Sequence, residues 1–541
     1  MNSVKILGPL SFLRFPCSFL SFLSFLFLLM IFVTLSVPLT HSQANTRDRA
    51  DLTAVSKGQS LHVLMIDSCM LPQTVDLLQG RNVVFEFVTS GNPVLKKLFN
   101  PSICTDHYSR AVGPVGKIAG FHSRFLGKKM KDAEFFKKTL DLLVKKRGPI
   151  DVVLANASDL AIYMGGIARQ HLDIRPAHWN ITTPECFYDK LTMKEALVSL
   201  APAIHTAPFV GLDWTPDKIE NFVKTTPFPL IFKRRRSAAS VGIQIVKDQK
   251  QFQEVFEQIK DKSNYLVEQF ITGQSLRIDG EKENGKILFS IPTFMRTSPL
   301  EHFQSGKSRV QTTIDESEVP LATIQDFVKQ STDALGMNSG TFHVEAIFSE
   351  QEKVLYFVEA GARPGAGNME TVLRDLHDYD PARTFYFRQV PANLWQADQQ
   401  SMFQDIVNKA HDRSHLGHVY AVLSYPFKDS NRFSLQNVKT NLHPATLGMS
   451  AQDIMSFGGC GFDKSIENAN PGALETKGIG IFRFTYEVGN MAIWCHFKGT
   501  RDQVERDLRS WQERFNFNAT PSSPFLNRFV PRKLFTAGGL E

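Results

Sequence analysis

A lysine and a small-residue turn form the first group of residues that could do chemistry. The segment Phe228–Val246, FPLIFKRRRSAASVGIQIV, begins with an apolar run that leads into Lys233. The turn that follows contains Ser240 and Gly242. A lysine at the end of a buried strand holds a cation within reach of phosphate oxygens, and a turn of small residues lets backbone N–H groups approach those oxygens closely. The alternatives for this segment are a surface charge at a strand end and a basic surface turn.

Two glutamates form the second group. The segment Gly340–Asn368, GTFHVEAIFSEQEKVLYFVEAGARPGAGN, predicts two strands that carry Glu345 and Glu359. Two carboxylates on adjacent strands can bridge Mg²⁺, which prefers few protein oxygens together with substrate phosphates. Arg363, which follows Glu359 in the same segment, could contact a transferring phosphoryl group or an acyl phosphate. Each glutamate alone could be a solvated strand position, but the order of the pieces along the chain favours a phosphate and metal site.

Two further segments accompany these groups. NYLVEQFITGQSLRIDG, at Asn264–Gly280, predicts a strand, a short linker and a second strand. YDKLTMKEAL, at Tyr188–Leu197, places an Asp-Lys pair upstream of them. With these segments in this order, the sequence resembles the ATP-grasp superfamily of carboxylate–amine ligases, which includes D-alanine–D-alanine ligase and L-amino-acid ligases. The resemblance covers roughly residues 188–370.

The resemblance implies a role for each matching residue. Lys190 and Lys233 would contact the phosphates of ATP, and Lys233 would also assist catalysis. Ser240 and Gly242 would lie in the phosphate loop, and Arg363 would be the catalytic arginine. The implied metal ligands, for Mg²⁺ or alternatively Mn²⁺, are Glu345 and Glu359. The implied contacts to the adenosine part of ATP are Glu268, Gln269, Phe270, Ile271 and Ser275.

The implied reaction joins a small-molecule carboxylate to a small-molecule amine through an acyl phosphate and releases ADP and phosphate. Three departures from the family pattern leave a second interpretation open, a nucleotide-binding protein with impaired catalysis. The chain has Ser237–Ala239 in place of loop glycines, Ser275 in place of a ribose-binding glutamate and Gly361 in place of an asparagine. Carboxylation, thioester formation and phosphorylation by the same fold also stay open. Dimers are common among relatives, so a homodimer is a further expectation.

Composition limits the class of protein. At 541 residues, with 43% hydrophobic and 21% charged residues, the chain is typical of a globular protein of about two to four domains. A net charge of +7 suits anionic substrates but lacks the signature of nucleic-acid binding, so we expect no nucleic-acid partner. The cysteines are scattered and include no C-x-x-C pair. This pattern excludes a zinc motif and a disulfide framework and fits a reducing compartment.

The N-terminus is a hydrophobic leader, residues 1–44, that lacks charge after Arg14. It exceeds the roughly 20 apolar residues needed to cross a bilayer. We expect a single membrane-spanning anchor with a cytosolic catalytic region, because an ATP-consuming enzyme needs cytosolic nucleotide. The alternative is a signal peptide cleaved near Ala44, followed by export. Glycosylation at Asn180 or Asn518, both in N-x-[ST] sequons, would contradict the cytosolic orientation.

After a linker at 45–59, strands alternate with helices. Apolar runs predict strands at Ser60–Asp67, Asn82–Val88 and Pro149–Ser158. Because strand–helix alternation is typical of a parallel sheet with covered faces, this region predicts a Rossmann-like domain. Leu98–Phe125 has few regular signals and predicts a loop. Asp159, just after the third strand, could contact substrate or cap a helix, and we favour the cap.

The predicted fold class is therefore α/β, with an ATP-grasp fold between the Rossmann-like domain and a small C-terminal β-rich domain. The predicted boundaries are 60–185 for the N-terminal domain, 186–395 for the ATP-grasp domain, 396–515 for the C-terminal domain and 516–541 for a tail. One stretch between the second and third motifs carries a set of basic residues that could bind substrate or belong to a solvated loop. This set comprises Arg296, His302, Lys307 and Arg309.

Overall fold

The computed structural model describes residues 60–67, 81–90, 117–238, 240–301, 309–314, 319–365, 381–395, 419–426, 457–462 and 491–514, with a few single positions between them. The predicted leader, linker and tail lie outside these ranges, as do His302, Lys307 and Asn518. Within the described ranges, none of the helices is both long enough and apolar enough to span a membrane.

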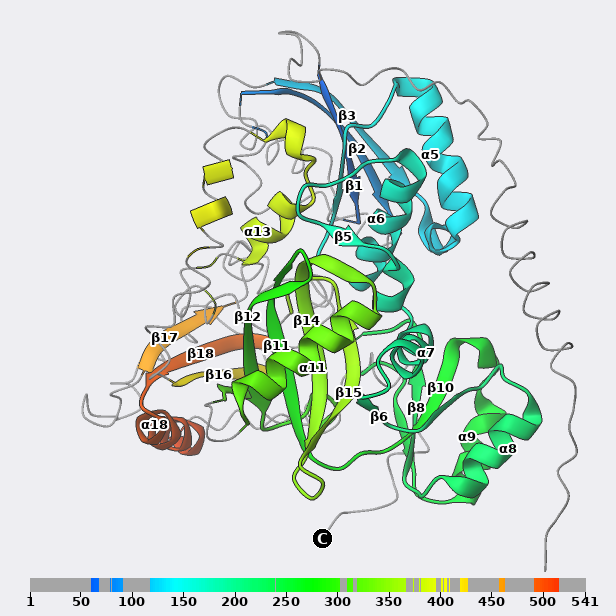
Figure 1. Ribbon diagram of the computed structural model, residues 1–541, viewed down its shortest axis with the longest axis vertical. Helices are drawn as coiled ribbons and strands as arrows, with labels where there is room; N and C mark the ends of the chain where they lie inside the picture. Colours follow the sequence, from blue (N-terminus) through cyan, green and yellow to red (C-terminus); the bar gives the residue numbers. More distant parts are fainter. Residues whose placement is uncertain are drawn as a thin grey trace, which may run out of the picture. The chain divides into compact units, whose positions relative to one another are not determined.

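The first sheet is parallel throughout and has the strand order β3-β2-β1-β4. Its strands are β1 (Leu61–Ile66), β2 (Asn82–Thr89), β3 (Lys117–Phe125) and β4 (Val152–Ala155). The run LHVLMI of β1 is buried at every position, as expected for a parallel strand covered on both faces. Helices α5 (Ala133–Arg147) and α6 (Asp159–Leu172) lie beside this sheet (Figure 1). The predicted Rossmann-like sheet is confirmed.

Strand β3 corrects the predicted loop at Leu98–Phe125. It is the last strand in the order of this sheet and, among the strands that the structure describes, pairs only with β2. Its sequence, KIAGFHSRF, mixes polar and apolar residues, and several of its side chains are exposed. Because an edge strand needs no continuous apolar run, hydrophobic periodicity did not reveal it.

A second, antiparallel sheet has the order β7-β10-β8-β9. Its strands are β7 (Phe209–Gly211), β8 (Leu230–Arg234), β9 (Gln244–Val246) and β10 (Tyr265–Gln269). Helices α8 (Pro216–Thr225) and α9 (Gln249–Gln258) lie next to it (Figure 1). Ile219 of α8 and Phe252 of α9 share one apolar core with Phe232 of β8. This core fixes β8, which carries Lys233.

The third sheet is ten-stranded, in the order β17-β18-β16-β13-β12-β11-β14-β15-β6, with β5 paired to β14. Its central strands are β11 (Gln274–Glu283), β12 (Lys286–Met295), β13 (Arg309–Thr313), β14 (Met337–Ser349) and β15 (Val354–Gly361). Its remaining strands are β5 (Asn180–Ile181), β6 (His205–Thr206), β16 (Val419–Pro426), β17 (Phe457–Phe462) and β18 (Met491–Gly499). The C-terminal strands thus continue the central sheet through β13, whereas the sequence predicted a separate β-rich domain.

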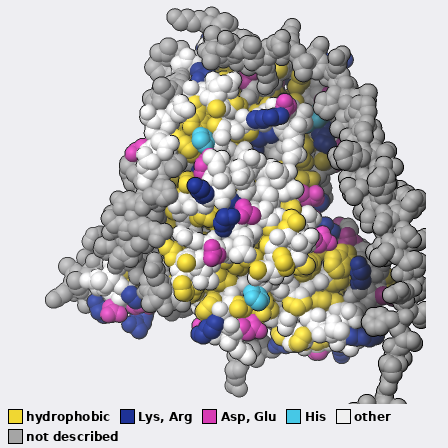
Figure 2. Space-filling model, viewed as in Figure 1, with side chains coloured by type: hydrophobic (Ala, Val, Ile, Leu, Met, Phe, Trp, Pro, Cys, Tyr) yellow, Lys and Arg dark blue, Asp and Glu magenta, His cyan; other side chains and the backbone are white. Residues whose placement is uncertain are grey.

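The two faces of this sheet differ in chemistry. Leu276 and Val344 point to one face and are buried together with Ile324 and Val328 of helix α11 (Leu321–Ala334). Successive side chains of a strand alternate between faces, so the intervening polar residues of β11 and β14 share the opposite face. Helix α11 crosses the ribbon of this sheet in Figure 1. On the surface drawn in Figure 2, basic and acidic side chains of the described residues are interspersed.

Candidate functional site

Helix α7 (Lys190–Leu200) is capped by a carboxylate that also binds two arginines just after β8. Asp189 caps the helix, since its Oδ1 accepts the N–H of Leu191 at 3.0 Å. The same carboxylate accepts from Arg235 at 2.9 Å and from Arg236 at 3.0 Å. The basic run after β8 is therefore tied to acidic partners, contrary to its interpretation as a simple basic surface turn. These contacts hold the start of α7 beside Lys233.

Lys190 lies between the predicted phosphate loop and a predicted metal ligand. Its Nζ donates to the carbonyl oxygen of Ser237 at 2.5 Å and lies 2.8 Å from Oε2 of Glu359. Burial would lower the pKa of Lys190, but the carboxylates of Glu359 and Asp159 outweigh it and raise this pKa. Lys190 therefore stays charged at the junction of α7, the loop and β15.

Glu268 joins two lysines inside the protein. Its Oε2 lies 3.2 Å from Nζ of Lys233 and 3.2 Å from Nζ of Lys194. Burial raises the pKa of Glu268, but the two lysines outweigh it and lower this pKa, so the carboxylate stays ionised. Sequence reasoning missed Lys194, although it lies one helical turn after Lys190, where i and i+4 side chains share a face. Glu268 is only 2% exposed, and its carboxylate is bound to the two lysines. Its main role in the structure is therefore to position these lysines.

The predicted adenosine contacts lie at the end of β10, just after it and near the start of β11. The N–H of Phe270 already donates to the carbonyl of Pro229 at 3.0 Å, and that of Gln269 to Pro208 at 2.9 Å. These two N–H groups are therefore already hydrogen-bonded within the protein, but backbone contacts to adenine also involve carbonyl oxygens, so the predicted adenine contact stays a prediction. The N–H of Ile271 makes no such bond among the described residues. Ser275 is the second residue of strand β11 and lies opposite Met295 of β12.

The loop after β8 contains two left-handed residues, Ser240 with φ of 55° and Gly242 with φ of 78°. A side chain at Gly242 would also bring its Cβ within 2.7 Å of Nε of Arg234. Glycine is therefore required at 242 by conformation and by space. Ser240 adopts the left-handed conformation despite its Cβ, so the loop keeps a turn typical of glycine without the usual family glycines.

The two predicted metal ligands lie directly opposite each other. Glu345 of β14 pairs with Glu359 of β15 in the antiparallel register, which places their Cβ atoms about 5 Å apart on the same face. Like charges in opposed positions destabilise a sheet unless a cation lies between them. The described residues contain no group of three or more side chains that could ligate a metal. Two carboxylates that leave other positions to water and phosphate fit Mg²⁺, so the residues present fit this ion.

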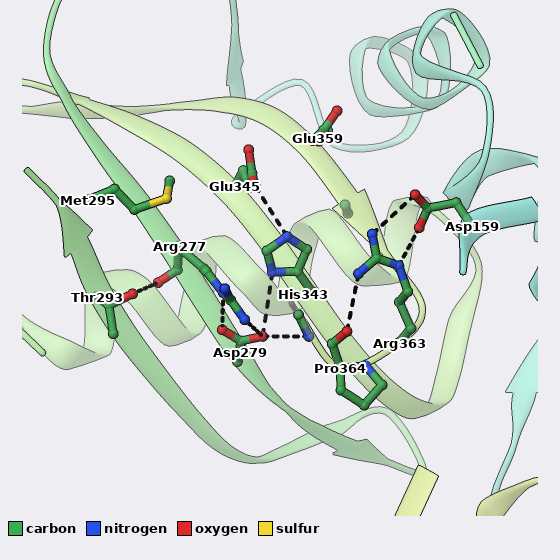
Figure 3. Close-up of polar contacts among 12 residues, drawn as sticks. Asp159, Arg277, Asp279, Thr293, Met295, His343, Glu345, Glu359, Arg363 and Pro364 are labelled. Carbon is green, nitrogen blue, oxygen red and sulfur yellow. Dashed lines mark hydrogen bonds and ion pairs between the residues drawn. The ribbon is translucent and has the colours of Figure 1, made fainter. Parts of the chain in front are cut away.

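A buried network behind Glu345 was not predicted. His343 places Nε2 3.3 Å from Glu345 and Nδ1 3.5 Å from Asp279 (Figure 3). Asp279 also accepts from Nε of Arg277 at 2.6 Å and from the N–H of Gly365 at 2.9 Å. Burial would raise the pKa of Glu345, but the hydrogen bond from His343 and the arginines nearby lower it to about 2. The network therefore keeps Glu345 ionised and oriented.

Arg363, the predicted catalytic arginine, is held by the N-terminal domain. Its Nε and Nη2 donate to the two carboxylate oxygens of Asp159 at 2.6 and 3.1 Å (Figure 3). Burial raises the pKa of Asp159, but Arg363 lowers it below its ordinary value. The helix cap expected at Asp159 is instead Ser158, whose hydroxyl oxygen accepts from Ala161. The substrate-facing alternative for Asp159 remains a prediction.

The two described members of the predicted basic set, Arg296 and Arg309, lie in different environments. Arg309 lies on β13 and is only 5% exposed, so the solvated-loop interpretation is wrong for this residue. Arg296, in contrast, forms an ion pair with Glu505 of the terminal helix α18 (Arg501–Arg514) and is partly exposed. Strand β13 follows a segment with no clear periodicity, which is why the sequence did not reveal it.

Comparisons with known proteins agree with this geometry. A family profile described as an ATP-grasp domain matches residues 226–372. The L-amino acid ligase of Bacillus licheniformis superimposes with a TM-score of 0.54 at 16% identity, over 84% of this chain and 98% of that chain. The phosphoribosylglycinamide synthetase of Anaerococcus prevotii superimposes with a TM-score of 0.51 at 14% identity, over 85% and 100%.

A search of curated protein sequences finds no match. At these identities the structural matches establish the fold, and the family profile establishes the domain. The profile includes β8, both predicted metal carboxylates and Arg363. Residues 226–372 are therefore an ATP-grasp domain, and the chain has the ATP-grasp fold.

Proposed function

We propose that this chain is an ATP-dependent ligase that joins a carboxylate to an amine. The observation that carries the proposal is the meeting of three elements at one point. Lys190 contacts both the loop after β8, through Ser237, and the carboxylate pair, through Glu359. Phosphate-binding cations and metal-binding carboxylates are thus adjacent, as transfer of the γ-phosphoryl group of ATP requires.

Each residue has a defined task in this reaction. Lys190 and Lys233 would neutralise phosphate oxygens, and Glu345 and Glu359 would hold Mg²⁺. When bound, the ion supplies charge neutralisation between the phosphates. Arg363 would stabilise negative charge that develops on the transferred group. No enzyme nucleophile is needed, because the protein acts by positioning and electrostatic stabilisation.

The proposed reaction balances in two steps. A carboxylate oxygen of the acid attacks the γ-phosphorus of ATP, and the bond from that phosphorus to the bridging oxygen breaks to release ADP. The amine nitrogen then attacks the acyl carbon, and the carbon–oxygen bond breaks to release phosphate while the nitrogen loses a proton. The products are an amide, ADP and phosphate.

The test is ADP release by the purified full chain with Mg²⁺, ATP and a panel of amino acids, followed by mass spectrometry of the products. We expect release that depends on substrate, that disappears in Glu359→Ala, and that accompanies a product equal to acid plus amine minus water. A product that has gained a phosphoryl group would indicate a kinase. Binding of ATP without release under any substrate would support the impaired nucleotide-binding protein suggested by Ser275 and Gly361.

We also propose that residues 1–44 anchor the chain with its catalytic region in the cytosol. Asn180 lies on β5 with an exposed side chain, so a glycosyltransferase could reach it if this region were lumenal. Extraction from membranes by alkaline carbonate, or glycosylation of Asn180 in the native host, would contradict the proposal. Retention in the membrane fraction with Asn180 unmodified would support it.

A further inference from the structure

Two polar side chains on strand β13 are buried without the partners that such groups normally have. Nε of Arg309 and both amide atoms of Gln311 have no hydrogen-bond partner among the described residues. Nη2 of Arg309 approaches the sulfur of Met295 at 3.1 Å, which is a weak acceptor. Buried polar atoms without a partner are rare and cost free energy. Oγ1 of Thr312, on the same strand, is also without a partner among the described residues but faces the opposite side of the strand. The two neighbouring side chains that share one face, Arg309 and Gln311, indicate that a ligand completes them.

Arg309 and Gln311 share the polar face with the metal carboxylates. Thr313, on the same strand, pairs with Thr293 of β12, which pairs with Arg277 of β11. Arg277 in turn pairs with Glu345 of β14. Directly paired residues point to the same face, and residues i, i+2 and i+4 of one strand also do. Arg309 and Gln311 therefore face the same side of the sheet as Glu345.

Arg309 differs from the other cations near the metal carboxylates in its ion pairing. Lys190 pairs with Glu359, Arg277 pairs with Asp279, and Arg363 pairs with Asp159. Arg309 forms no ion pair with any carboxylate of the described residues within 4.0 Å. Burial and the nearby Arg277 lower the pKa of Arg309 to about 10, although Glu345 and Asp279 counteract them. A buried, unpaired guanidinium is a ready site for an anion.

The two side chains together define the chemistry of that ligand. The guanidinium of Arg309 offers a planar set of N–H donors, which suits a carboxylate. The amide of Gln311 offers an N–H donor and a carbonyl acceptor. A complementary ligand therefore carries a carboxylate next to an N–H group. An α-amino acid has both groups on adjacent atoms.

We propose that Arg309 and Gln311 form a subsite for the α-carboxylate and α-amino group of an amino acid, one of the two substrates, whose α-carboxylate stays unreacted. This inference extends the proposed ligase by naming a substrate class, and it depends on that proposal for the role of the ligand as a substrate. Either the amine donor or an amino acid activated at its side-chain carboxyl group would satisfy the subsite.

The experiment measures binding directly and without turnover. The full chain in detergent is titrated by isothermal calorimetry with each natural L-amino acid and with its α-methyl ester, with and without Mg²⁺ and a non-hydrolysable ATP analogue. We expect at least one amino acid to bind and its ester to bind about 30-fold more weakly or worse, because the ester leaves Arg309 buried and unpaired. Binding only of amino acids with a side-chain carboxyl group would identify the ligand as the activated acid. Binding of amino acids without one would identify it as the amine donor.

Variants on β13 provide matched controls. Arg309→Lys and Gln311→Met should each weaken amino-acid binding by about tenfold or more. Thr312→Val should leave it within about twofold, because Thr312 is equally buried on the same strand and its Oγ1 also has no partner among the described residues, but its side chain faces the opposite side. If Arg309→Lys does not fold, Gln311→Met, which is close in size, decides the question.

Several outcomes would overturn the inference. They are the absence of amino-acid binding in the wild type, equal binding of the ester, or variants that lower the melting temperature yet keep wild-type affinity. The last result would assign Arg309 and Gln311 a structural role, with water as their partner. Binding of the ATP analogue is measured in the same titrations. Its loss counts against the proposed ligase, whereas analogue binding with amino-acid affinity independent of Arg309 counts against this subsite alone.

Discussion

Nζ of Lys190 lies 2.8 Å from Oε2 of Glu359, so a predicted phosphate-binding lysine contacts a predicted metal ligand. Lys190 begins α7, whereas Glu359 lies near the end of β15, so the contact joins segments far apart in the sequence. Mg²⁺ and Lys190 would share the Glu359 carboxylate in the proposed complex.

Glu359→Gln should lower ADP release by about 100-fold or more, since it removes one of two carboxylates proposed to hold the ion and breaks the ion pair of Lys190. A coupled assay over a range of Mg²⁺ concentrations measures the effect. Glu352→Gln is the matched control, because Glu352 lies exposed in the same hairpin and accepts a hydrogen bond from Tyr356. Wild-type activity in Glu359→Gln would remove Glu359 from the site.

Lys194→Met should destabilise the protein by about 3 kcal/mol, because it breaks a buried ion pair and leaves Glu268 with Lys233 alone. Urea unfolding measures the change. Lys224→Met is the control: the Lys224–Glu220 pair is exposed, so about 0–1 kcal/mol is expected. A similar small effect at Lys194 would contradict the prediction.

Gly361→Asn restores the family pattern but should lower ADP release by about tenfold, the scale of a small misplacement at a catalytic group. A Cβ at this position would lie 3.2 Å from Oδ1 of Asp159 and 3.4 Å from Cγ of Arg363, so the larger side chain would displace their ion pair. Gly361→Ala, which adds the Cβ alone, should have an intermediate effect. A rise in activity in Gly361→Asn would instead support the impaired-enzyme interpretation.

The stability contributed by Glu345 should depend on pH. The pKa of Glu345 is lowered from 4.5 to about 2 in the folded protein, so its stabilising effect is complete above about pH 5 and is lost as pH falls toward 2. The difference in unfolding free energy between wild type and Glu345→Gln, without metal, should therefore decrease by about 2 kcal/mol between pH 7 and pH 3. Urea unfolding at both pH values measures it. A difference that stays constant would show that His343 does not hold Glu345 in its ionised form.

Much of the fold could be predicted because its signals are local. The buried strands β1, β2 and β4 follow from apolar runs within single segments. Lys233, Glu345 and Glu359 were recognisable as a set because each comes at a fixed place in an ordered series of strands. The sequence could also indicate that Glu345 and Glu359 would be neighbours, since the two strands form a hairpin.

The tertiary structure alone decided which side chains became partners. His343 and Asp279 lie on strands β14 and β11, and Asp159 reaches Arg363 from another sheet. Lys194 meets Glu268, and Arg309 is buried on a strand without a clear pattern. Such contacts depend on strand order and register, which long-range packing determines. The residue types along one segment do not reveal strand order or register. The sequence therefore predicted the chemical groups, and the fold determined how they are paired.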